Sequence, residues 1–243
     1  MQCLVLAGGL GTRMAPVTER VPKCLLEVAG RPFAHWQLEW LAAQGVRRVV
    51  FSIGHLGEAV RAELGDGGRF GVELTYVDEG PVLLGTGGAL RLAVERGVTE
   101  ASFFVLYGDS YLTVDLAAVA RAFTDRRAEA LMTVFRNRGR WERSNAVFDG
   151  ESVVRYDKTL AEPPPEMAWV DYGLSVLSSA VVLETVPAGG PSDLADALHR
   201  LSIQGRLAGF EVTERFYEIG SPSGHAELEA LLRGRAGAGS SAS

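Results

Sequence analysis

Short apolar runs rich in β-branched and aromatic residues alternate with helical patterns through the first half of this chain. The runs that predict buried strands cover residues 2–6, 47–53, 72–77 and 102–107. Helical spacing of apolar residues, which places them on one face, covers residues 33–43, 57–64, 86–95 and 115–127. Strands that alternate with helices are typical of a mostly parallel sheet with helices on both of its faces. The sequence therefore predicts an α/β fold.

A different pattern begins at about residue 128, where β structure predominates. Alternating apolar residues predict strands over residues 130–135, 145–149, 152–156 and 168–177. Turn residues at Asp149–Gly150 and in the run Pro163-Pro164-Pro165 separate these strands. This half has the form expected for the second side of a two-part binding site.

Helices return near the end of the chain, over residues 192–204 and 222–233. Ser192 or Asp193 is a suitable N-cap for the first of them, and Pro222 suits the first turn of the second. We therefore expect helices to cover the β-rich half as well.

These patterns together predict one domain over residues 1–233. Residues 1–127 form its first half and residues 128–233 its second half. Residues 234–243 are rich in Gly, Ala and Ser, a composition that predicts a disordered tail.

Charge and hydropathy exclude several classes of protein. The formal net charge of -6 argues against nucleic acid as a main partner, because binding to a phosphate backbone needs a basic surface. No apolar run approaches the roughly 20 residues that cross a bilayer, and the N-terminus lacks the basic region of a signal peptide. We expect a cytoplasmic protein without a membrane partner. The arginine-rich residues 136–143 are interpreted as a solvated loop or a subunit contact, so a homo-oligomer is compatible with the sequence.

Cysteine and histidine give no metal site. Cys3 belongs to the first predicted strand, and Cys24 follows Lys23, where it can lie at the edge of a pocket. The four histidines have no metal-ligand spacing with each other or with cysteine. We assign none of them to a metal.

Lysine is rare in this chain, since only Lys23 and Lys158 occur among the 24 basic residues. A chain that uses arginine for almost every positive charge is expected to keep lysine where a compact ammonium is needed. Phosphate oxygens are one such need. A solvated surface position is the alternative for either lysine taken alone.

A glycine-rich loop, Gly8-Gly9-Leu10-Gly11-Thr12-Arg13, directly follows the first predicted strand. Glycine permits backbone conformations in which successive N–H groups face one anion, so the loop is a candidate phosphate site. It does not match the dinucleotide pattern, because Met14 occupies the third glycine position, and it lacks the Gly-Lys-Ser/Thr of a P-loop. A simple turn is the alternative.

Two acidic residues are notable for their positions. Asp109 follows Gly108 at the carboxyl end of a predicted strand, where open α/β sheets bind their ligands. A plain Gly-Asp turn is the alternative for this dipeptide. Glu218 precedes the last predicted helix.

The segment from Leu6 to Lys23 resembles the signature of the sugar-phosphate nucleotidyltransferases, and the resemblance extends along almost the whole chain. It implies a Rossmann-like, GT-A-like sheet with a β-rich sugar-binding half, and an enzyme that joins a nucleoside triphosphate to a sugar 1-phosphate with Mg²⁺ as cofactor. By position it implies catalytic roles for Arg13, Lys23, Asp109 and Lys158. The implied nucleotide-binding residues are Leu6, Ala7, Gly8, Gly9, Gly11, Thr12, Arg13, Lys23, Glu79, Gly85, Thr86 and Gly87. The implied sugar-phosphate-binding residues are Gly108, Asp157, Lys158, Asp171 and Gly173, and the metal ligands are Asp109 and Glu218.

The sequence departs from this family at two site positions. Glu218 stands where relatives usually have aspartate, and Asp171-Tyr172-Gly173 stands where they often have Asn-Ala-Gly. A carboxylate only accepts hydrogen bonds, so Asp171 is expected to favour a sugar ring that presents hydroxyl groups. Tyr172 is expected to narrow the pocket or to stack along it.

The substrate is less well defined than the reaction. Similar motifs occur in the guanylyltransferases of heptose 1-phosphate and mannose 1-phosphate, which favours GTP, but the uridylyltransferase of N-acetylmuramic acid 1-phosphate is close in pattern. A glycosyltransferase is a rival hypothesis, although the expected Asp-x-Asp motif is replaced by Asp109-Ser110-Tyr111. A non-catalytic sensor of nucleotide sugars is another, since one fold hosts many functions.

Overall fold

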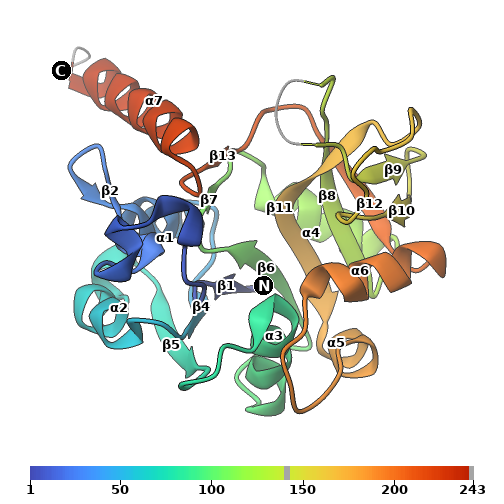
Figure 1. Cartoon of the computed structure of the whole chain (residues 1–243), viewed down its shortest axis with the longest axis horizontal. Coiled ribbons are helices and arrows are strands. Elements are labelled where there is room, and N and C mark those ends of the chain that lie inside the picture. The colour runs from blue at the N-terminus through green and yellow to red at the C-terminus, as the bar shows by residue number, and fades with distance from the viewer. Residues whose placement is uncertain (140–142, 241–243) are drawn as a thin grey trace.

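The computed structural model describes residues 1–139 and 143–240. Its central sheet contains nine strands among these residues, in the order β10-β9-β11-β6-β1-β4-β5, with β8 on β11 and β12 on β8. Figure 1 shows the sheet running through the molecule with helices packed around it. The α/β fold expected from the alternation is confirmed.

The first half of the sheet is parallel. Strand β1 lies between β4 and β6, β5 pairs with β4, and all of these pairs are parallel. The elements of this half are β1 (Gln2–Leu6), β2 (Glu27–Val28), β3 (Arg31–Pro32), α1 (Phe33–Ala43), β4 (Arg48–Ile53), α2 (Gly57–Leu64), β5 (Glu73–Asp78), α3 (Gly85–Glu95), β6 (Ser102–Tyr107), β7 (Ser110–Tyr111) and α4 (Leu116–Asp125). Four short 3₁₀ helices also occur, at η1 (Thr12–Met14), η2 (Val17–Glu19), η3 (Lys23–Leu25) and η4 (Gly68–Phe70).

The second half of the sheet is mixed. Strand β11 runs antiparallel to β6 and to β8, and β12 runs parallel to β8. The elements are β8 (Ala130–Arg136), β9 (Ala146–Phe148), β10 (Val153–Tyr156), β11 (Trp169–Ser178), α5 (Ser179–Thr185), α6 (Leu194–Ile203), β12 (Ala208–Val212), β13 (Tyr217–Glu218) and α7 (Pro222–Ser240). Because β11 is reversed, its first residues lie at the edge where β6 ends.

Helices cover both faces of the sheet, as predicted. One buried cluster joins the sheet to α1, α2 and α4 through Leu38, Val60 and Val119. The other joins it to α3, α5 and α6 through residues such as Leu90 and Leu198. A smaller cluster packs α7 against α1, β2 and β13. It holds the last helix beside the first half of the chain (Figure 1).

Most predicted elements are confirmed. The differences concern the N-cap of α6 and the C-terminal end of α7. Asp193, rather than Ser192, is the N-cap of α6, because its side chain accepts a hydrogen bond from Ala195 N. Helix α7 continues to Ser240, past the expected end at residue 233, and residues 241–243 of the expected tail lie outside the described residues. Residues 140–142 of the arginine-rich stretch also lie outside them.

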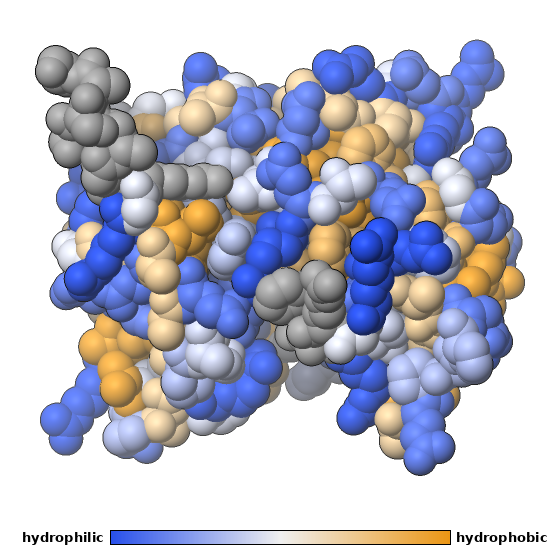
Figure 2. Space-filling model, turned by 90° about the horizontal axis from the view of Figure 1, so that it is seen from above, coloured by the Kyte–Doolittle hydropathy of each residue, from blue (hydrophilic) through white to orange (hydrophobic). Residues whose placement is uncertain are grey.

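In the face shown in Figure 2, hydrophobic residues form scattered patches between hydrophilic ones. No helix in the described part of the chain is long and apolar enough to cross a membrane.

Candidate active site

The glycine-rich loop leaves the sheet at the end of β1 and turns back toward Lys23. Gly11 has φ +63°, a conformation that favours glycine, and it precedes η1. Its carbonyl oxygen accepts hydrogen bonds from Met14 N, at 2.8 Å, and from Thr18 Oγ1, at 2.9 Å. These bonds close the loop, so that Lys23 lies at the same edge of the sheet as the end of β1.

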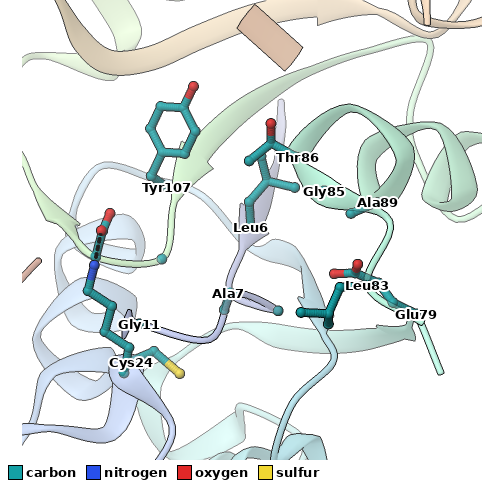
Figure 3. Close-up of a pocket in the computed structure, with 15 residues that line it drawn as sticks. Leu6, Ala7, Gly11, Cys24, Glu79, Leu83, Gly85, Thr86, Ala89 and Tyr107 are labelled. Carbon is teal, nitrogen blue, oxygen red and sulfur yellow. Dashed lines mark hydrogen bonds and ion pairs between the residues drawn. The ribbon is translucent and has the colours of Figure 1, made fainter. Parts of the chain in front are cut away.

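A first cavity of about 240 Å³ opens at this edge. Figure 3 shows Glu79 and Tyr107 at opposite ends of it, with Leu6 between them. Its lining residues come from the ends of β1 and β6, the glycine loop and the start of α3. They are Leu6, Ala7, Gly8, Gly9, Gly11, Lys23, Cys24, Glu79, Leu83, Gly85, Thr86, Ala89, Tyr107, Gly108 and Asp109.

An ion pair lies at one end of this cavity. Lys23 Nζ donates to Asp109 Oδ2 at 2.5 Å, and both side chains are partly buried. Gly108, which precedes Asp109, allows the end of β6 to approach the end of β1 closely, because a Cβ at this position would lie 2.8 Å from Leu6 O. The two residues, which were predicted from separate motifs, are therefore in direct contact.

Glu218 joins this group from the far end of the chain. Strand β13 pairs with β7, which sets Glu218 opposite Ser110, and Ile219 N donates to Asp109 O at 2.9 Å. The Glu218 carboxylate accepts hydrogen bonds from Gly220 N and from Ser221 Oγ. The local turn thus fixes the carboxylate beside Asp109.

Gly220 marks the point at which the charged side chains converge. A Cβ on Gly220 would lie 2.9 Å from Lys23 Nζ, 3.0 Å from Arg13 Nη2 and closer still to Glu218. Two cations and two carboxylates therefore surround one small volume. Such a grouping suits a ligand that carries several negative charges together with a divalent cation.

A second cavity of about 210 Å³ adjoins the first and shares Tyr107 and Asp109 with it. It lies between the end of β6, the start of β11 and the turn after β12. Its lining residues are Arg13, Tyr107, Asp109, Ser110, Asn145, Lys158, Asp171, Tyr172, Gly173, Phe216 and Glu218.

Lys158 carries the positive charge of this second cavity. Its Nζ lies 3.4 Å from Asp171 Oδ2, and 5.3 and 5.6 Å from the ring centres of Tyr107 and Tyr156. Burial alone would lower the pKa of Lys158, but Tyr107 and Asp171 outweigh this and raise the pKa above its ordinary value. The ammonium therefore stays charged at neutral and moderately alkaline pH.

Both oxygens of the Asp171 carboxylate have partners in the protein. Its Oδ1 accepts from Gly173 N at 2.9 Å, and its Oδ2 accepts from Tyr156 Oη at 3.1 Å and faces Lys158. Gly173, with φ +95°, lies in a bulge of β11 that makes this turn possible. Asp171 thus positions Lys158, and because Asp171 also lines the second cavity, its contact with sugar hydroxyl groups stays a prediction.

Tyr172 lines the second cavity, as expected from its place beside Asp171. It is buried, packs edge-on against Phe216, and has its hydroxyl within 3.2 Å of Thr113 Oγ1. Its ring forms part of the wall of the second cavity and is held there by the core.

Three predicted site residues do not line either cavity. Thr12 is exposed at the start of η1, and Asp157 bonds to the backbone and hydroxyl of Thr159. Gly87 N donates to Ser192 O at 2.9 Å, and a Cβ there would meet Ser192 Oγ. This N–H of α3, which we expected to face a ligand, is used to pack α3 against the segment before α6. Gly85 and Thr86 do line the first cavity.

Several lining residues were not predicted, and Tyr107 is the most important of them. It immediately precedes Gly108, so its position at the end of a buried strand was a usable signal. Leu83 and Ala89 gave no such signal, because apolar residues there are equally consistent with packing. Cys24 lies at the pocket edge as expected, and burial raises the pKa of its thiol to about 12, so the thiol is unreactive.

The carboxylate of Glu79 lies at the apolar end of the first cavity. Its Oε2 accepts a hydrogen bond from Leu84 N at 2.8 Å. Burial raises the pKa of Glu79, and the neighbouring Asp78 adds to this, while the bond from Leu84 lowers it. The negative charge at this position is therefore held at a cost, which is typical of a binding site.

A divalent cation fits the carboxylates that line the second cavity. Asp109 and Glu218 both lie on its wall, and no larger group of metal-binding side chains occurs among residues 1–139 and 143–240. Magnesium commonly uses one or two carboxylates and completes its shell with water and substrate phosphates. The pair fits such an ion.

Comparison with known proteins identifies related sequences. The model of the family described as nucleotidyl transferase matches residues 2–188. Glucose-1-phosphate thymidylyltransferase from Streptomyces griseus is 30% identical over 212 residues, which cover 85% of this chain and 58% of the relative. N-acetylmuramate alpha-1-phosphate uridylyltransferase from Neisseria meningitidis serogroup B is 36% identical over 118 residues, covering 49% of this chain and 51% of the relative.

A third relative is named as a guanylyltransferase, whereas the first two are named as a thymidylyltransferase and a uridylyltransferase. D-glycero-alpha-D-manno-heptose 1-phosphate guanylyltransferase from Aneurinibacillus thermoaerophilus is 34% identical over 118 residues, which cover 48% of this chain and 49% of the relative. The chain spans about half the length of these curated relatives.

Solved structures share the fold. HddC from Yersinia pseudotuberculosis superposes with a TM-score of 0.79 at 20% identity, covering 95% of this chain and 99% of that chain. The inositol-1-phosphate CTP transferase of T. maritima superposes with a TM-score of 0.74 at 24% identity, covering 94% of both chains. The expected α/β fold with a β-rich half is thus a known architecture.

Proposed function

Because the family match covers most of its length, this chain belongs to the nucleotidyl transferase family, and we propose that it transfers a nucleotidyl group to a sugar 1-phosphate. The observation that carries the proposal is the junction of the two cavities at Tyr107 and Asp109. The first cavity would hold a nucleoside triphosphate and the second a sugar 1-phosphate. Their phosphates would then meet beside Lys23, Arg13 and Asp109.

The proposed reaction needs alignment more than acid–base chemistry. A phosphate oxygen of the sugar 1-phosphate attacks the α-phosphorus of the triphosphate, and the bond to pyrophosphate breaks. The attacking oxygen is already anionic, so no side chain must remove a proton. Lys23 and Arg13 neutralise the triphosphate at the junction, and Lys158 holds the incoming phosphate. Asp109 and Glu218 would hold Mg²⁺, which supplies further charge neutralisation when it is bound.

Glu79 favours guanine as the base. A carboxylate that only accepts hydrogen bonds matches the adjacent N1–H and N2–H donors of guanine, whereas uracil and thymine offer one N–H. Glu79 lies at the end of the first cavity opposite Tyr107, which leaves the space between them for the ribose and phosphates (Figure 3). We therefore propose GTP as the nucleotide and a heptose or mannose 1-phosphate as its partner.

Direct measurement of pyrophosphate tests this proposal. The purified protein is incubated with Mg²⁺, each of the four common nucleoside triphosphates and dTTP, against a panel of hexose and heptose 1-phosphates. We expect pyrophosphate with GTP and a manno-configured sugar phosphate, and none after removal of Mg²⁺ with EDTA. Turnover with another base alone would refute the GTP assignment, and no turnover with any pair would refute the reaction.

Replacement of Glu79 by glutamine tests the base assignment. Glutamine keeps an acceptor for Leu84 N but presents an amide to the base, so we expect the KM for GTP to rise about tenfold, which is about 1.4 kcal/mol. The KM for the sugar phosphate should not change. Glu73→Gln, at an exposed position of β5, is the matched control. An unchanged KM for GTP would remove Glu79 from the base site.

The same variant should also show a stability effect with a defined sign. A raised carboxyl pKa means that the folded state is disfavoured once Glu79 ionises, at pH values above the unfolded pKa. Glu79→Gln should therefore unfold at an equal or higher temperature than the native protein at pH 7. This difference should disappear as the pH falls below the ordinary carboxyl range.

A further inference from the structure

Asn145 is a buried side chain on the wall of the second cavity, and no motif in the sequence pointed to it. It lies just before β9 and is 6% exposed. Its backbone is held on both sides, because Asn145 N donates to Trp169 O and Asn145 O accepts from Asp157 N. The backbone of Asn145 is therefore fixed beside the first residue of β11.

The orientation of the Asn145 amide follows from one hydrogen bond. Asp171 N donates to Asn145 Oδ1 at 2.9 Å, and only the oxygen of the amide can accept it. The Nδ2 group must then point the other way. Among the described residues no protein group accepts a hydrogen bond from this Nδ2, and it is not one of the buried polar atoms without a partner. Its accessible side must therefore be the one in the cavity.

The neighbouring acceptor is already used. Asp171, which lies next to Asn145, accepts from Gly173 N and Tyr156 Oη and faces Lys158. At this end of the second cavity, the Nδ2 of Asn145 is thus a hydrogen-bond donor that can meet a neutral part of a ligand. A donor held in a nearly buried site discriminates strongly, because a ligand without the matching oxygen leaves it unpaired.

We propose that Asn145 is a specificity-determining residue, whose Nδ2 donates a hydrogen bond to one ring hydroxyl oxygen of the sugar 1-phosphate. This inference rests on the proposed function and deepens it. Lys158 holds the phosphate, and Asp171 positions Lys158. Asn145 donates a hydrogen bond to the sugar ring beside them. The Asp171 backbone N–H donates to Asn145 Oδ1, so the Asn145 amide is held at a fixed place beside Asp171.

The test compares the native protein with Asn145→Asp. The aspartate retains an oxygen that accepts from Asp171 N, but it has no donor to offer the sugar. Both proteins are assayed by kcat/KM with the sugar 1-phosphate that is turned over and with its series of single-deoxy analogues. For one analogue, we expect the native protein to lose about 10- to 100-fold against the parent sugar. Asn145→Asp should turn over that analogue and the parent about equally.

Two controls keep the result specific. Asn145→Ala removes the donor without adding a charge, and it should lose the same discrimination at the same ring position. Asn137→Asp changes the other asparagine of the chain, which lies outside both cavities, and it should discriminate like the native protein. The KM for the triphosphate and the unfolding temperature are measured to confirm that each variant is folded.

The outcomes separate this inference from the proposed function. If none of the sugar 1-phosphates tested leads the native protein to release pyrophosphate, the proposed function is refuted, and this inference is refuted with it. If turnover occurs and both Asn145 variants reject the same deoxy analogue as strongly as the native protein, the reaction stands and the role of Asn145 is refuted.

Discussion

The Asp109→Asn variant is expected to lose about 10³-fold in kcat. Asp109 lies on the wall of both cavities and binds Lys23, so it is the one acidic group that both proposed substrates would adjoin. The amide keeps the size of the side chain but removes the charge that would hold Mg²⁺ and orient the Lys23 ammonium. Pyrophosphate release at saturating substrates measures the loss, and a Mg²⁺ titration should show a higher concentration for half-maximal activity.

A matched aspartate is available as the control for this result. Asp125, at the end of α4, is exposed and makes no side-chain bond that stabilises the site. Asp125→Asn should keep native activity and native Mg²⁺ dependence. If Asp109→Asn behaved in the same way, the metal and charge roles assigned to Asp109 would be wrong.

The Lys158→Met variant is expected to raise the KM for the sugar 1-phosphate by about 100-fold, since it removes a charged hydrogen bond of about 1.5–3 kcal/mol. The KM for the triphosphate should stay near its native value, because Lys158 lines only the second cavity. Methionine has a similar length and is compatible with the rings of Tyr107 and Tyr156, so the fold should persist. Steady-state kinetics with each substrate varied in turn give the two constants.

Arginine should not replace Lys158. The ammonium lies near two tyrosine rings and one carboxylate, and the planar, forked guanidinium of arginine differs in shape and donor geometry from this compact charge. Lys158→Arg should therefore recover little of the lost affinity. Arg121→Met, at an exposed position of α4, is the control for loss of a positive charge. A rise in the KM for the triphosphate alone would contradict the assignment of Lys158 to the sugar phosphate.

The sequence predicted the fold well where local patterns decide it. The buried runs at 2–6 and 102–107 became β1 and β6, because short, strongly apolar segments between helices have few alternatives in a parallel sheet. The short strands β7 and β13 were not predicted, since two residues each give no periodicity. Strand β12 was also missed, because its pairing with β8 depends on contacts far away in the chain.

The site was predictable where a residue's chemistry is visible in its local motif. Lys23, Asp109 and Lys158 each follow a recognisable signal, and the structure places all three on the cavity walls. Asp171 was correctly located, but its partners were not foreseeable, because Tyr156 and Gly173 reach it only through a bulged strand. Asn145 could not be predicted for the same reason. Its role depends on the hydrogen bond from Asp171 N to its Oδ1, which only the folded structure shows.

The pairing of β13 with β7 has a consequence for biosynthesis. A nascent chain that has emerged from the ribosome as far as β12 contains every strand of the nine-stranded sheet and both lysines. It still lacks Glu218 and the turn at Gly220 around which Arg13 and Lys23 gather. Every lining residue of the first cavity is therefore synthesised before Glu218, and the grouping of charged side chains around Gly220 is the last part of the site to be completed.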